Sequence, residues 1–497
     1  MKILTTSDLH SYIYPYDYSD NKEKNMGLSR LSTLINEIRD NDTIIIDNGD
    51  VLEGSPLSFY HFNFDENNIH PMSRVMNYIG YDYINVGNHD FNYGEKHLLK
   101  HLDYLNAKCI TCNVLYKNEF IGKSYIRQMS NGKKIGIFGI VTQYIPNWEK
   151  EENIVNFKFL NAFEVCKEKV NDLRDKVDYI VCVYHGGFER DLETNELLEP
   201  ETFENVGSKI LNEIEGIDIL LTGHQHRSIS CKVKDTIVTQ SASNAKEISF
   251  VKINNEITSS LLIADKEADY EMLKLVDEDE KKCQVWLDEK LGESKVDLKV
   301  NDEFDARLNK HQVITFLNMV QKDISNADLS SCALFINAKG FNEYITYRDI
   351  VSTYTYPNTL VVKKINGKTL KAYLEKCAEY FEIENDEIVV NNKYIYPKLQ
   401  HFNYDMVDGI DYTIKVSNDV GNRIVKLKYK GKDIKEDDSF SIVLNNYRSS
   451  GGGDFSMIKD SKVIKEIQTS MVEILANYIL KNKVIDFEPV NNINVIK

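Results

Sequence analysis

Five short segments in the first half of the chain place metal-binding side chains directly after apolar runs. They contribute Asp, Asn and His residues in this order: Asp8 and His10; Asp50; Asn88, His89 and Asp90; His185; and His224 and His226. Each segment alone is more simply explained as a turn or a helix cap, because Asp, Asn and Gly favour turn conformations. Five unrelated turns would have to choose metal-ligand residues independently, so the complete set predicts a metal site.

The residue types limit which ions could bind and which reaction these ions could support. Imidazole nitrogens and carboxylate oxygens suit Zn, Mn, Fe or Co. Asp50 is the candidate bridge between two ions, because it is a lone carboxylate central to the set. Three residues are then expected on each ion: Asp8, His10 and His226 on one, and Asn88, His185 and His224 on the other. Two ions about 3.5–4 Å apart could activate a water between them and stabilise an in-line displacement at phosphorus.

His89 and Asp90 are the candidate catalytic residues. His89 follows a ligand, so its ring points elsewhere if Asn88 is held to metal. It is then placed to donate a proton to a leaving alkoxide or to bind a phosphoryl group. Asp90 has two interpretations of equal weight: it could orient His89, or it could cap a helix that begins near Tyr93.

The apolar runs that precede these residues are predicted to be strands of a layered α/β structure. The expected strands are 2–7, 42–48, 81–88, 134–141, 178–185, 218–225 and 236–243, and helical patterns occur at 28–40 and 162–177. Strands that alternate with helices indicate an α/β sheet. Because ligands bind beyond the carboxyl ends of the strands in such sheets, we expect all five segments at the same edge of the sheet.

The chain of 497 residues is too long for one hydrophobic core, so at least two domains are expected. Residues 265–291 are strongly charged, with apolar residues at near-helical spacing, and predict an exposed connecting helix. We therefore expect a metal-binding domain at 1–264, a connecting helix at 265–293 and a second domain at 294–497. The second domain is predicted to be α+β: it has a helix at 311–324, a strand–helix pattern at 359–381, and strands at 411–417, 424–434 and 440–446.

The net charge of −17 argues against a nucleic-acid polymer as partner, since polyanion binding depends on basic patches. Small anionic ligands remain compatible, because bound cations can reverse the local potential. No run of about 18 apolar residues predicts a membrane span. No signal peptide is visible, so a cytoplasmic location is expected unless an export signal has been removed. The oligomeric state leaves no signal in the sequence.

The eight cysteines are scattered through the chain, which indicates reduced thiols rather than a disulfide framework. Cys109 and Cys112 form one C-x-x-C pair inside AKCITCNVLY, which is predicted to be a buried strand. No second pair follows to complete a zinc site, so a structural role is expected for both.

The motifs DLH, GD, GNHD, HGG and GHQH, in this order, resemble those of the calcineurin-like metallophosphoesterase superfamily. A helical linker followed by an α+β domain resembles the 5′-nucleotidase group within it, and the resemblance covers nearly the whole chain. It implies a layered αββα domain that holds two divalent metal ions, followed by a nucleotide-binding domain of the 5′-nucleotidase type.

Further stretches resemble the bacterial 2′,3′-cyclic-nucleotide 2′-phosphodiesterase/3′-nucleotidase branch: 346–360, 401–414, 444–455, YPYDY at 14–18, and FNYG after GNHD. The 5′-nucleotidase branch usually has GNHEFD, whose last Asp partners the catalytic His. Asn92 stands at that position here, which favours the cyclic-phosphodiesterase branch and leaves the partner of His89 undefined. The region that should supply phosphate-binding arginines, ALFINAKGFNEY, has Lys339 and no Arg.

The resemblance also implies that two aromatic rings of the second domain clamp the base of a nucleotide. By motif these are Tyr356, in YPN, and Tyr447, in NNYR, and aromatic faces stack on any base. Tyr354 is the expected substitute for Tyr356, because the two would face the same side of a strand. The other candidate substrate-binding residues are Asn358 at the base edge, and Gly451, Gly452, Gly453 and Asp454 in a loop that allows close backbone approach.

These features together predict hydrolysis of 2′,3′-cyclic nucleotides to 3′-nucleotides by a metal-activated water. Removal of the 3′-phosphate, to give nucleoside and phosphate, would follow at the same metals. Three alternatives stay open: a 5′-nucleotidase or nucleotide-sugar hydrolase, a phosphodiesterase of broader range, and a nucleotide-binding protein without turnover.

Overall fold

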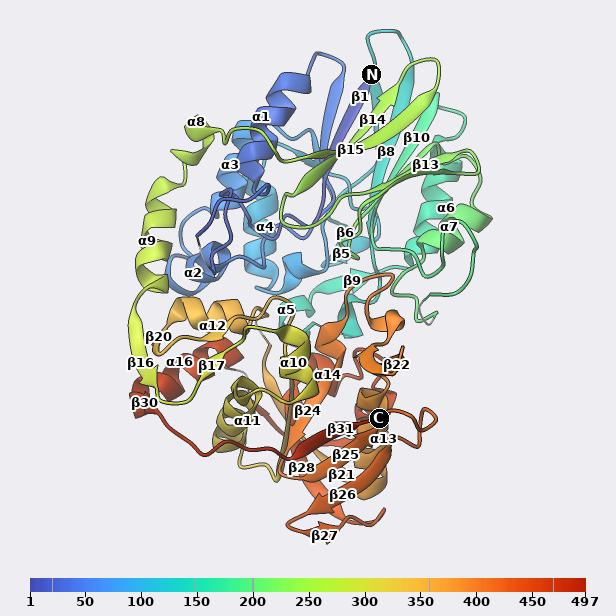
Figure 1. The fold of residues 1–497 in the computed structure, drawn as a ribbon. Coiled ribbons are helices and arrows are strands. Elements are labelled where there is room, and N and C mark those ends of the chain that lie inside the picture. The colour runs from blue at the N-terminus through green and yellow to red at the C-terminus, as the bar shows by residue number, and fades with distance from the viewer. Residues whose placement is uncertain (20, 148, 199–200, 357, 468) are drawn as a thin grey trace. The chain divides into compact units, whose positions relative to one another are not determined.

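The computed structural model describes residues 1–19, 21–147, 149–198, 201–356, 358–467 and 469–497. The chain forms two compact units, Met1–Gln284 and Val285–Lys497 (Figure 1). The segment predicted as one connecting helix, 265–293, holds two short helices and the start of a strand. These are α8 (Tyr270–Leu273), α9 (Asp277–Leu287) and β16 (Lys290–Ser294).

Two six-stranded sheets form the centre of the first unit. One has the order β15-β14-β1-β2-β3-β4: β1 (Lys2–Thr6), β2 (Thr43–Asp47), β3 (Tyr83–Ile84), β4 (Lys108–Cys109), β14 (Glu247–Ile253) and β15 (Ile257–Ile263). The other has the order β12-β13-β11-β10-β8-β7: β7 (Tyr125–Gln128), β8 (Lys134–Val141), β10 (Tyr179–His185), β11 (Ile219–Thr222), β12 (Ile229–Val233) and β13 (Thr236–Gln240). Strands β1 to β4 are parallel, and so are β8, β10, β11 and β13.

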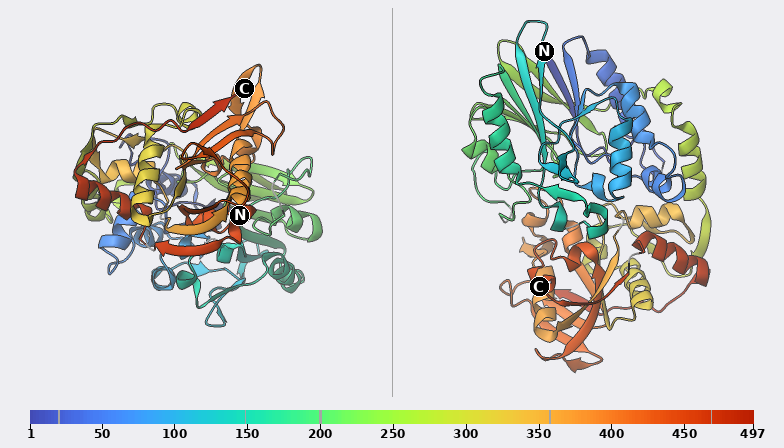
Figure 2. Two further views of the ribbon diagram at one scale, coloured as in Figure 1. Left: turned by 90° about the horizontal axis from the view of Figure 1, so that it is seen from below. Right: turned by 180° about the vertical axis from the view of Figure 1, so that it is seen from behind.

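The two sheets pack face to face over an apolar core. Ile3, Ile44 and Ile46 of the first sheet share a buried cluster with Val181 and Val183 of the second. The outer face of the second sheet packs on α6 (Ala162–Leu173) and α7 (Gly207–Glu213). On the other side lie α1 (Leu28–Ile38), α3 (Pro71–Ile79) and α4 (Glu95–Tyr104), as both views of the unit show (Figure 2). The expected αββα layering is therefore confirmed.

Two predicted strands end earlier than expected. The run 81–88 forms a ladder only over Tyr83–Ile84, and the run 218–225 ends at Thr222. The residues that follow leave the sheet, and His224 already has a left-handed backbone with φ 69°. The predicted strand around the C-x-x-C pair is also broken: β4 ends at Cys109, and β5 (Val114–Tyr116) pairs in a separate small sheet with β6 (Glu119–Phe120) and β9 (Phe157–Phe159).

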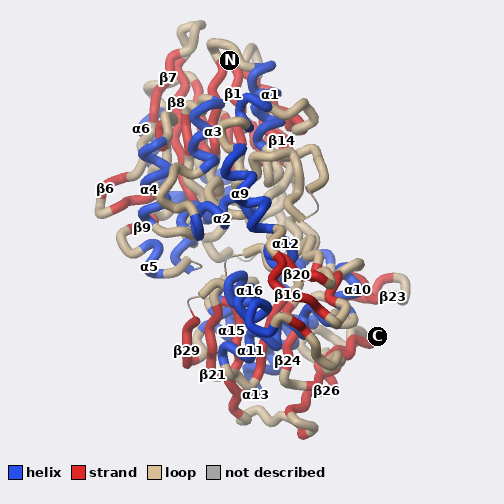
Figure 3. The backbone as a smooth tube through the Cα atoms, turned by 90° about the vertical axis from the view of Figure 1, so that its left-hand side faces the viewer, coloured by secondary structure: helices blue, strands red, loops and turns tan. Residues whose placement is uncertain are grey.

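The second unit is α+β, as predicted. Its five-stranded sheet has the order β24-β18-β28-β21-β29: β18 (Leu329–Ala333), β21 (Leu360–Asn366), β24 (Asp405–Asp408), β28 (Ser439–Asn445) and β29 (Lys462–Ile467). A four-stranded sheet contains β25 (Asp411–Lys415), β26 (Ile424–Tyr429), β27 (Lys432–Asp433) and β31 (Ile493–Ile496). Helix α11 (Gln312–Ser325) packs on β18 and on α16 (Met471–Asn482) (Figure 3). The second unit also contains α12 (Tyr347–Thr353), α13 (Gly367–Ala378) and α14 (Asn446–Ser449).

The charged segment before Gln284 is not an exposed connector, contrary to the prediction. Met272, Val276 and Cys283 are fully buried. Glu280 is 5% exposed and accepts a hydrogen bond from Tyr18 Oη at 2.8 Å and another from Tyr16 Oη. The YPYDY stretch therefore anchors α9 to the first unit, which periodicity alone did not reveal. No described helix has the length and apolar character needed to cross a membrane.

Candidate metal centre

The strand ends of the first unit bring the seven predicted metal ligands together. Asp8 and His10 follow β1, Asp50 follows β2, Asn88 follows β3, His185 ends β10, and His224 and His226 follow β11. They come from two stacked sheets. The expectation that all five segments lie at the same edge of one sheet is therefore wrong. The two sheets meet at Asn48, whose Nδ2 donates to Tyr184 O at 3.1 Å and whose carbonyl accepts from His185 Nδ1 at 2.6 Å.

The ligand atoms form two groups. In the first donor group, Asp8, His10 and His226 each offer one atom within 4.8 Å of the others. In the second donor group, Asp50, His185 and His224 do the same. The first group contains the three residues expected on one ion, and the second contains two of the three expected on the other, His185 and His224, together with the candidate bridge Asp50.

Asn88 lies with the second donor group. Its Oδ1 is 2.8 Å from His224 Nδ1 and 3.2 Å from His185 Nε2. An amide oxygen at that position can serve as a further ligand beside the two imidazoles.

Asp50 shows that a cation fits this site. Its Oδ1 accepts a hydrogen bond from the backbone N–H of His89 at 2.7 Å. Its Oδ2 is buried and has no hydrogen-bond partner within the part of the chain that the structure describes. Its nearest charged neighbour is His185 Nε2 at 3.2 Å. A buried carboxylate oxygen that makes no hydrogen bond is costly, so this oxygen is suited to bind a positive charge.

The histidine tautomers support the same conclusion. His10 Nδ1 faces the carbonyl of Glu53 at 2.9 Å, and His185 Nδ1 faces the carbonyl of Asn48. A carbonyl can only accept, so Nδ1 carries the hydrogen in both rings and Nε2 is left to bind an ion. His10 Nε2 lies 3.1 Å from His226 Nε2, and His185 Nε2 lies 3.2 Å from Asp50 Oδ2.

The charge balance around His185 also favours a cation. Burial lowers the pKa of this imidazole, but the Asp50 and Asp8 carboxylates raise it more strongly, to about 10. The two carboxylates therefore favour a positive charge at His185. A divalent ion could supply that charge in place of a proton, because imidazole binds a metal in its neutral form.

The backbone is strained at most of the ligands. Five of the seven have positive φ angles: Asp8 54°, His10 49°, Asp50 58°, His224 69° and His226 57°. Left-handed conformations of non-glycine residues concentrate at functional sites, where the surrounding structure holds them in place. Gly87 is needed for the same packing, because a Cβ there would lie 2.1 Å from Asp50 Oδ1.

Asp90 has neither of the roles expected for it. Its carboxylate accepts four backbone N–H groups: Gly87 at 2.8 Å, Asp50 at 3.1 Å, Val51 at 2.8 Å and Leu52 at 3.0 Å. Helix α4 begins at Glu95, and its N-cap Gly94 receives no side-chain cap. Asp90 therefore positions the loop that carries the candidate ligand Asp50, instead of acting on His89 directly.

His89 lies beside the first donor group, with its ring centroid 5.5 Å from that of His10. Its Nδ1 faces Asn92 Oδ1 at 2.7 Å and Glu53 Oε2 at 3.4 Å. The sequence analysis missed Glu53, although it lies only three residues after Asp50. It also missed Glu204, whose Oε1 is 2.9 Å from His224 Nε2, because Glu204 lies in a loop without a recognisable motif.

The predicted base-binding tyrosines lie on neighbouring segments of the second unit. Leu360 and Asn445 pair directly, and the backbone N–H of Asn446 donates to Thr359 O at 2.9 Å. This places the segments that carry Tyr356 and Tyr447 side by side, and both rings are half-buried. Pro357, within the same YPN motif as Tyr356, lies outside the described residues.

Tyr354 is not a substitute for Tyr356. It follows helix α12 instead of lying in a strand, and it is only 2% exposed. Its ring packs edge-on against Phe335, with the centroids 4.9 Å apart, and its hydroxyl interacts with the Asn358 side chain. Tyr354 therefore belongs to the core, and Asn358 is engaged within the protein. Phe335 also packs on Tyr356, with the ring centroids 5.2 Å apart, and the sequence did not predict this contact.

A buried arginine supports the glycine loop after Tyr447. Arg448 is 1% exposed, and it pairs with Asp405 through Nε at 2.9 Å and Nη2 at 3.1 Å. Its Nη1 donates to the carbonyl of Gly452, whose Cβ position would lie 2.6 Å from the Tyr447 ring. The loop thus depends on glycine next to Tyr447.

The other members of this loop are placed as follows. Gly451 and Gly453 have positive φ angles of 93° and 72°. Asp454 is exposed and lies 3.8 Å from Lys376, so its negative charge is partly balanced. Lys339, in the region expected to carry arginines, is exposed.

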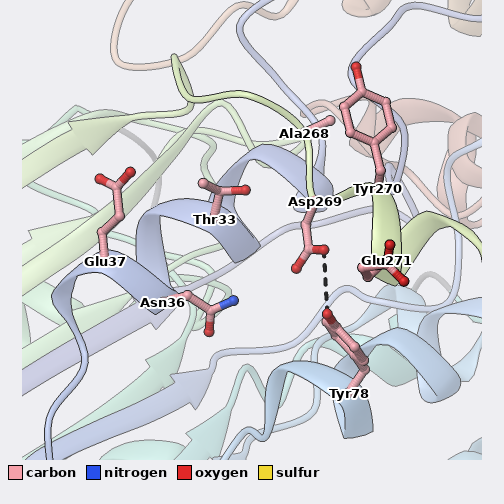
Figure 4. A pocket seen from close by; sticks show the side chains of 8 residues that line it. All are labelled: Thr33, Asn36, Glu37, Tyr78, Ala268, Asp269, Tyr270 and Glu271. Atoms are coloured by element: carbon pink, nitrogen blue, oxygen red, sulfur yellow. Dashed lines mark hydrogen bonds between the residues drawn. The ribbon is translucent and has the colours of Figure 1, made fainter.

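A separate cavity of about 550 Å³ lies on the first unit between α1, α3 and α8 (Figure 4). Its lining includes Glu37, Asp269 and Glu271, and Asp269 already accepts hydrogen bonds from Ser32 Oγ and the N–H of Met272. Three carboxylates without a bound cation do not suit an anionic ligand. This cavity contains none of the predicted site residues.

Comparison with known proteins gives two family matches: calcineurin-like phosphoesterase over residues 1–228, and 5′-nucleotidase C-terminal domain over residues 290–460. The trifunctional nucleotide phosphoesterase protein YfkN of Bacillus subtilis (strain 168) is 25% identical over 99% of this chain, which spans 38% of that longer protein. A 2′,3′-cyclic-nucleotide 2′-phosphodiesterase/3′-nucleotidase of Salmonella typhimurium is 27% identical over 91% of this chain and 81% of its own length. A crystal structure from Staphylococcus aureus, named for a 5′-nucleotidase in complex with α-ketoglutarate, has 32% identity and a TM-score of 0.93, and covers 100% of this chain and 99% of that chain.

Proposed function

We propose that this chain, which belongs to the calcineurin-like phosphoesterases with a 5′-nucleotidase C-terminal domain, hydrolyses 2′,3′-cyclic nucleotides to 3′-nucleotides and then releases the 3′-phosphate. The observation that carries the proposal is the buried Oδ2 of Asp50 at the second donor group, which meets only the imidazole Nε2 of His185, at 3.2 Å, among the described residues. The names of the Salmonella typhimurium and Bacillus subtilis relatives support the substrate class.

The protein would hold two divalent ions, one at each donor group, with Asp50 between them and Asn88 at the second. When bound, such ions lower the pKa of a water and stabilise negative charge on phosphoryl oxygens. The carbonyls of Glu53 and Asn48 accept from Nδ1 of His10 and His185, so Nε2 would be the atom of each ring that binds an ion.

His89 is the proton donor to the leaving oxygen in this mechanism. Its Nδ1 is engaged by Asn92, so Nε2 is the atom left to face a substrate. In the first reaction the 2′-oxygen leaves and takes up a proton, and in the second the 3′-oxygen does. Tyr356 and Tyr447 of the second unit would stack on the base of the nucleotide.

The main rival is a 5′-nucleotidase or nucleotide-sugar hydrolase. The name of the Staphylococcus aureus structure favours it, and the absence of Asp at Asn92 and of Arg near the exposed Lys339 disfavours it. A phosphodiesterase of broader range would use the same residues. A binding protein without turnover is disfavoured because all seven ligands are present and grouped.

The deciding experiment measures phosphate and nucleoside release from 2′,3′-cAMP, 3′-AMP and 5′-AMP side by side. The enzyme is treated with EDTA and then supplied with Mn²⁺. The proposal expects release from the first two substrates only, and only after Mn²⁺ is restored. Preferred hydrolysis of 5′-AMP would keep the metal centre and reject the proposed substrate, whereas tight binding without release would support the binding protein.

A further inference from the structure

A chain of hydrogen bonds runs from His89 to a carboxylate that no motif contains. His89 Nδ1 lies 2.7 Å from Asn92 Oδ1, and Asn92 Nδ2 donates to Glu149 Oε2 at 2.5 Å. Glu149 is held in turn by Asn153, whose Nδ2 donates to Glu149 Oε1 and to the backbone carbonyl of Asn92, both at 2.8 Å. The chain therefore ends in a negative charge that is itself positioned by neighbouring side chains.

The carboxylate sets the direction of every bond in this chain. An ionised carboxylate can only accept, so the NH₂ end of the Asn92 amide must face Glu149. The carbonyl end of the amide then faces His89 and can only accept in turn. His89 must donate from Nδ1, and Nε2 is left free to exchange a proton with a substrate.

A second carboxylate acts on the same nitrogen from the other side. Glu53 Oε2 lies 3.4 Å from His89 Nδ1, and the Glu53 side chain is only 4% exposed. The backbone carbonyl of Glu53 holds His10 at 2.9 Å. One residue thus contacts both a candidate metal ligand and the candidate proton donor.

We propose that Glu149, acting through the Asn92 amide and assisted by Glu53, is the positioning residue that sets the tautomer and orientation of His89. This inference rests on the proposed phosphoester hydrolysis and deepens it. Asn92 stands where a direct aspartate partner would be expected, and Glu149 supplies the missing charge from one side chain farther away. The Asn92 amide contacts His89 directly, and the Glu149 carboxylate contacts the other end of that amide.

The test is a double-mutant cycle on Glu149→Gln and Asn92→Asp. A glutamine can donate as well as accept, so Glu149→Gln lets the Asn92 amide take either orientation and the ring lose its fixed tautomer. Removal of such a partner costs about 10- to 100-fold in activity. With Asn92→Asp a carboxylate faces His89 directly, but its other oxygen meets the Glu149 carboxylate where Asn92 Nδ2 now donates at 2.5 Å. The added Glu149→Gln change supplies a donor there and removes the repulsion, so it should raise activity in the Asn92→Asp background and lower it in the parent, which makes the two substitutions strongly non-additive.

The leaving group separates positioning of a proton donor from a general structural loss. Phenyl phosphate needs its leaving oxygen protonated far more than p-nitrophenyl phosphate does. Glu149→Gln should therefore reduce kcat mainly for phenyl phosphate, with KM little changed. Glu151→Gln is the matched control, because Glu151 is exposed in the same segment and should leave both rates unchanged.

The second measurement does not depend on turnover. Nitrogen NMR of ¹⁵N-histidine-labelled, metal-free protein reports the tautomer of each ring at a pH where the ring is neutral. For His89 that pH lies above the usual range, because burial lowers its pKa but the Asp50 and Glu53 carboxylates raise it more strongly. Loss of one signal in His89→Asn identifies His89 among the 11 histidines. The proposal expects a single Nδ1–H tautomer in the parent and in Glu151→Gln, and a mixture in Glu149→Gln. A single unchanged tautomer in Glu149→Gln would overturn the proposal. Equal losses of kcat on phenyl phosphate and p-nitrophenyl phosphate would also overturn it. So would an equal loss of activity from Glu149→Gln in the parent and in Asn92→Asp.

The two proposals fail in different ways. If the nucleotides are not hydrolysed but the tautomer shifts in Glu149→Gln, the substrate assignment is wrong and the positioning role stands. If 2′,3′-cAMP and 3′-AMP are hydrolysed while Glu149→Gln changes neither tautomer nor rate, the function stands and the role of Glu149 is rejected.

Discussion

Asp50 and His185 face each other across the junction of the two sheets, with Oδ2 of the carboxylate 3.2 Å from Nε2 of the imidazole. Asp50 is only 1% exposed and His185 is fully buried. Asp50 follows a strand of the first sheet, and His185 ends a strand of the second. An ion bound here would therefore join the two halves of the sandwich.

Replacing Asp50 by Ala should remove activity and bound metal together. Loss of a shared ligand removes several kcal/mol of transition-state stabilisation, or about 10³-fold in rate or more. The check is metal content by elemental analysis together with phosphate release from 2′,3′-cAMP. Asp103→Ala, at an exposed position on α4, is the control and should retain both. Full activity of Asp50→Ala would reject Asp50 as the bridge.

Chelation should lower the thermal stability of the first unit. An ion that binds only the folded state adds about 2.7 kcal/mol at a concentration 100 times its Kd. For a unit of this size that corresponds to about 5–10 °C in Tm. Calorimetry with EDTA, and then with increasing Mn²⁺, should show a Tm that rises with the metal concentration. In Asp50→Ala the same titration should give a smaller rise; an identical rise would place the ion elsewhere.

Replacing Tyr447 by Ala should weaken nucleotide binding selectively. Stacking on a base contributes about 1–3 kcal/mol, so KM for 3′-AMP should rise about 10- to 100-fold. Bis-p-nitrophenyl phosphate has no base, and its hydrolysis should be nearly unchanged. Tyr344→Ala, where the ring is 57% exposed in the same unit, is the control. Equal losses on both substrates would mean that Tyr447 has a structural role.

Replacing Arg448 by Ala should destabilise the second unit. The change leaves Asp405 buried without its partner, and breaking a buried ion pair costs about 3–5 kcal/mol. Calorimetry should show a Tm lower by about 10 °C for the transition of this unit. Arg348→Ala removes a pair whose Asp288 side chain is 63% exposed, and it should cost less than about 1 kcal/mol. Equal effects of the two substitutions would show that burial of the Arg448 pair does not matter.

The sequence defined the ligand residues better than the residues that support them. Asp50 and His185 could be predicted because each stands where an apolar run ends, which is visible in one dimension. The role of Asp90 could not, because three of its four hydrogen bonds come from the backbone of residues 50–52, whose path brings them to Asp90, and the fourth comes from Gly87. Glu149 was invisible for a related reason: it reaches Asn92 from 57 positions away, and no local pattern encodes that contact.

Periodicity also could not distinguish a solvated helix from one whose partner lies far away in sequence. The charges of residues 265–291 suggested exposure, yet Glu280 is buried, and the hydroxyls of two tyrosines near the N-terminus donate hydrogen bonds to its carboxylate oxygens. Tyr354 is the opposite case. It was placed in a strand beside Tyr356, but α12 continues to Thr353 and turns the Tyr354 ring into the core.

The amide of Asn92 passes on the direction of hydrogen bonding but cannot conduct a proton. A carboxylate behind the imidazole could store a proton between turnovers, whereas an amide has none to release near neutral pH. On the proposed mechanism His89 gives up its Nε2 proton in each cycle, and the Asn92 amide cannot replace it. Two sources remain: the solvent, because the His89 side chain is 27% exposed, and the Glu53 carboxyl, whose Oε2 lies 3.4 Å from Nδ1. Burial raises the pKa of Glu53 to about 7, so this carboxyl can hold a proton near neutral pH. Recharging of the acid therefore depends on Glu53 and on solvent, and not on the chain from Asn92 to Glu149.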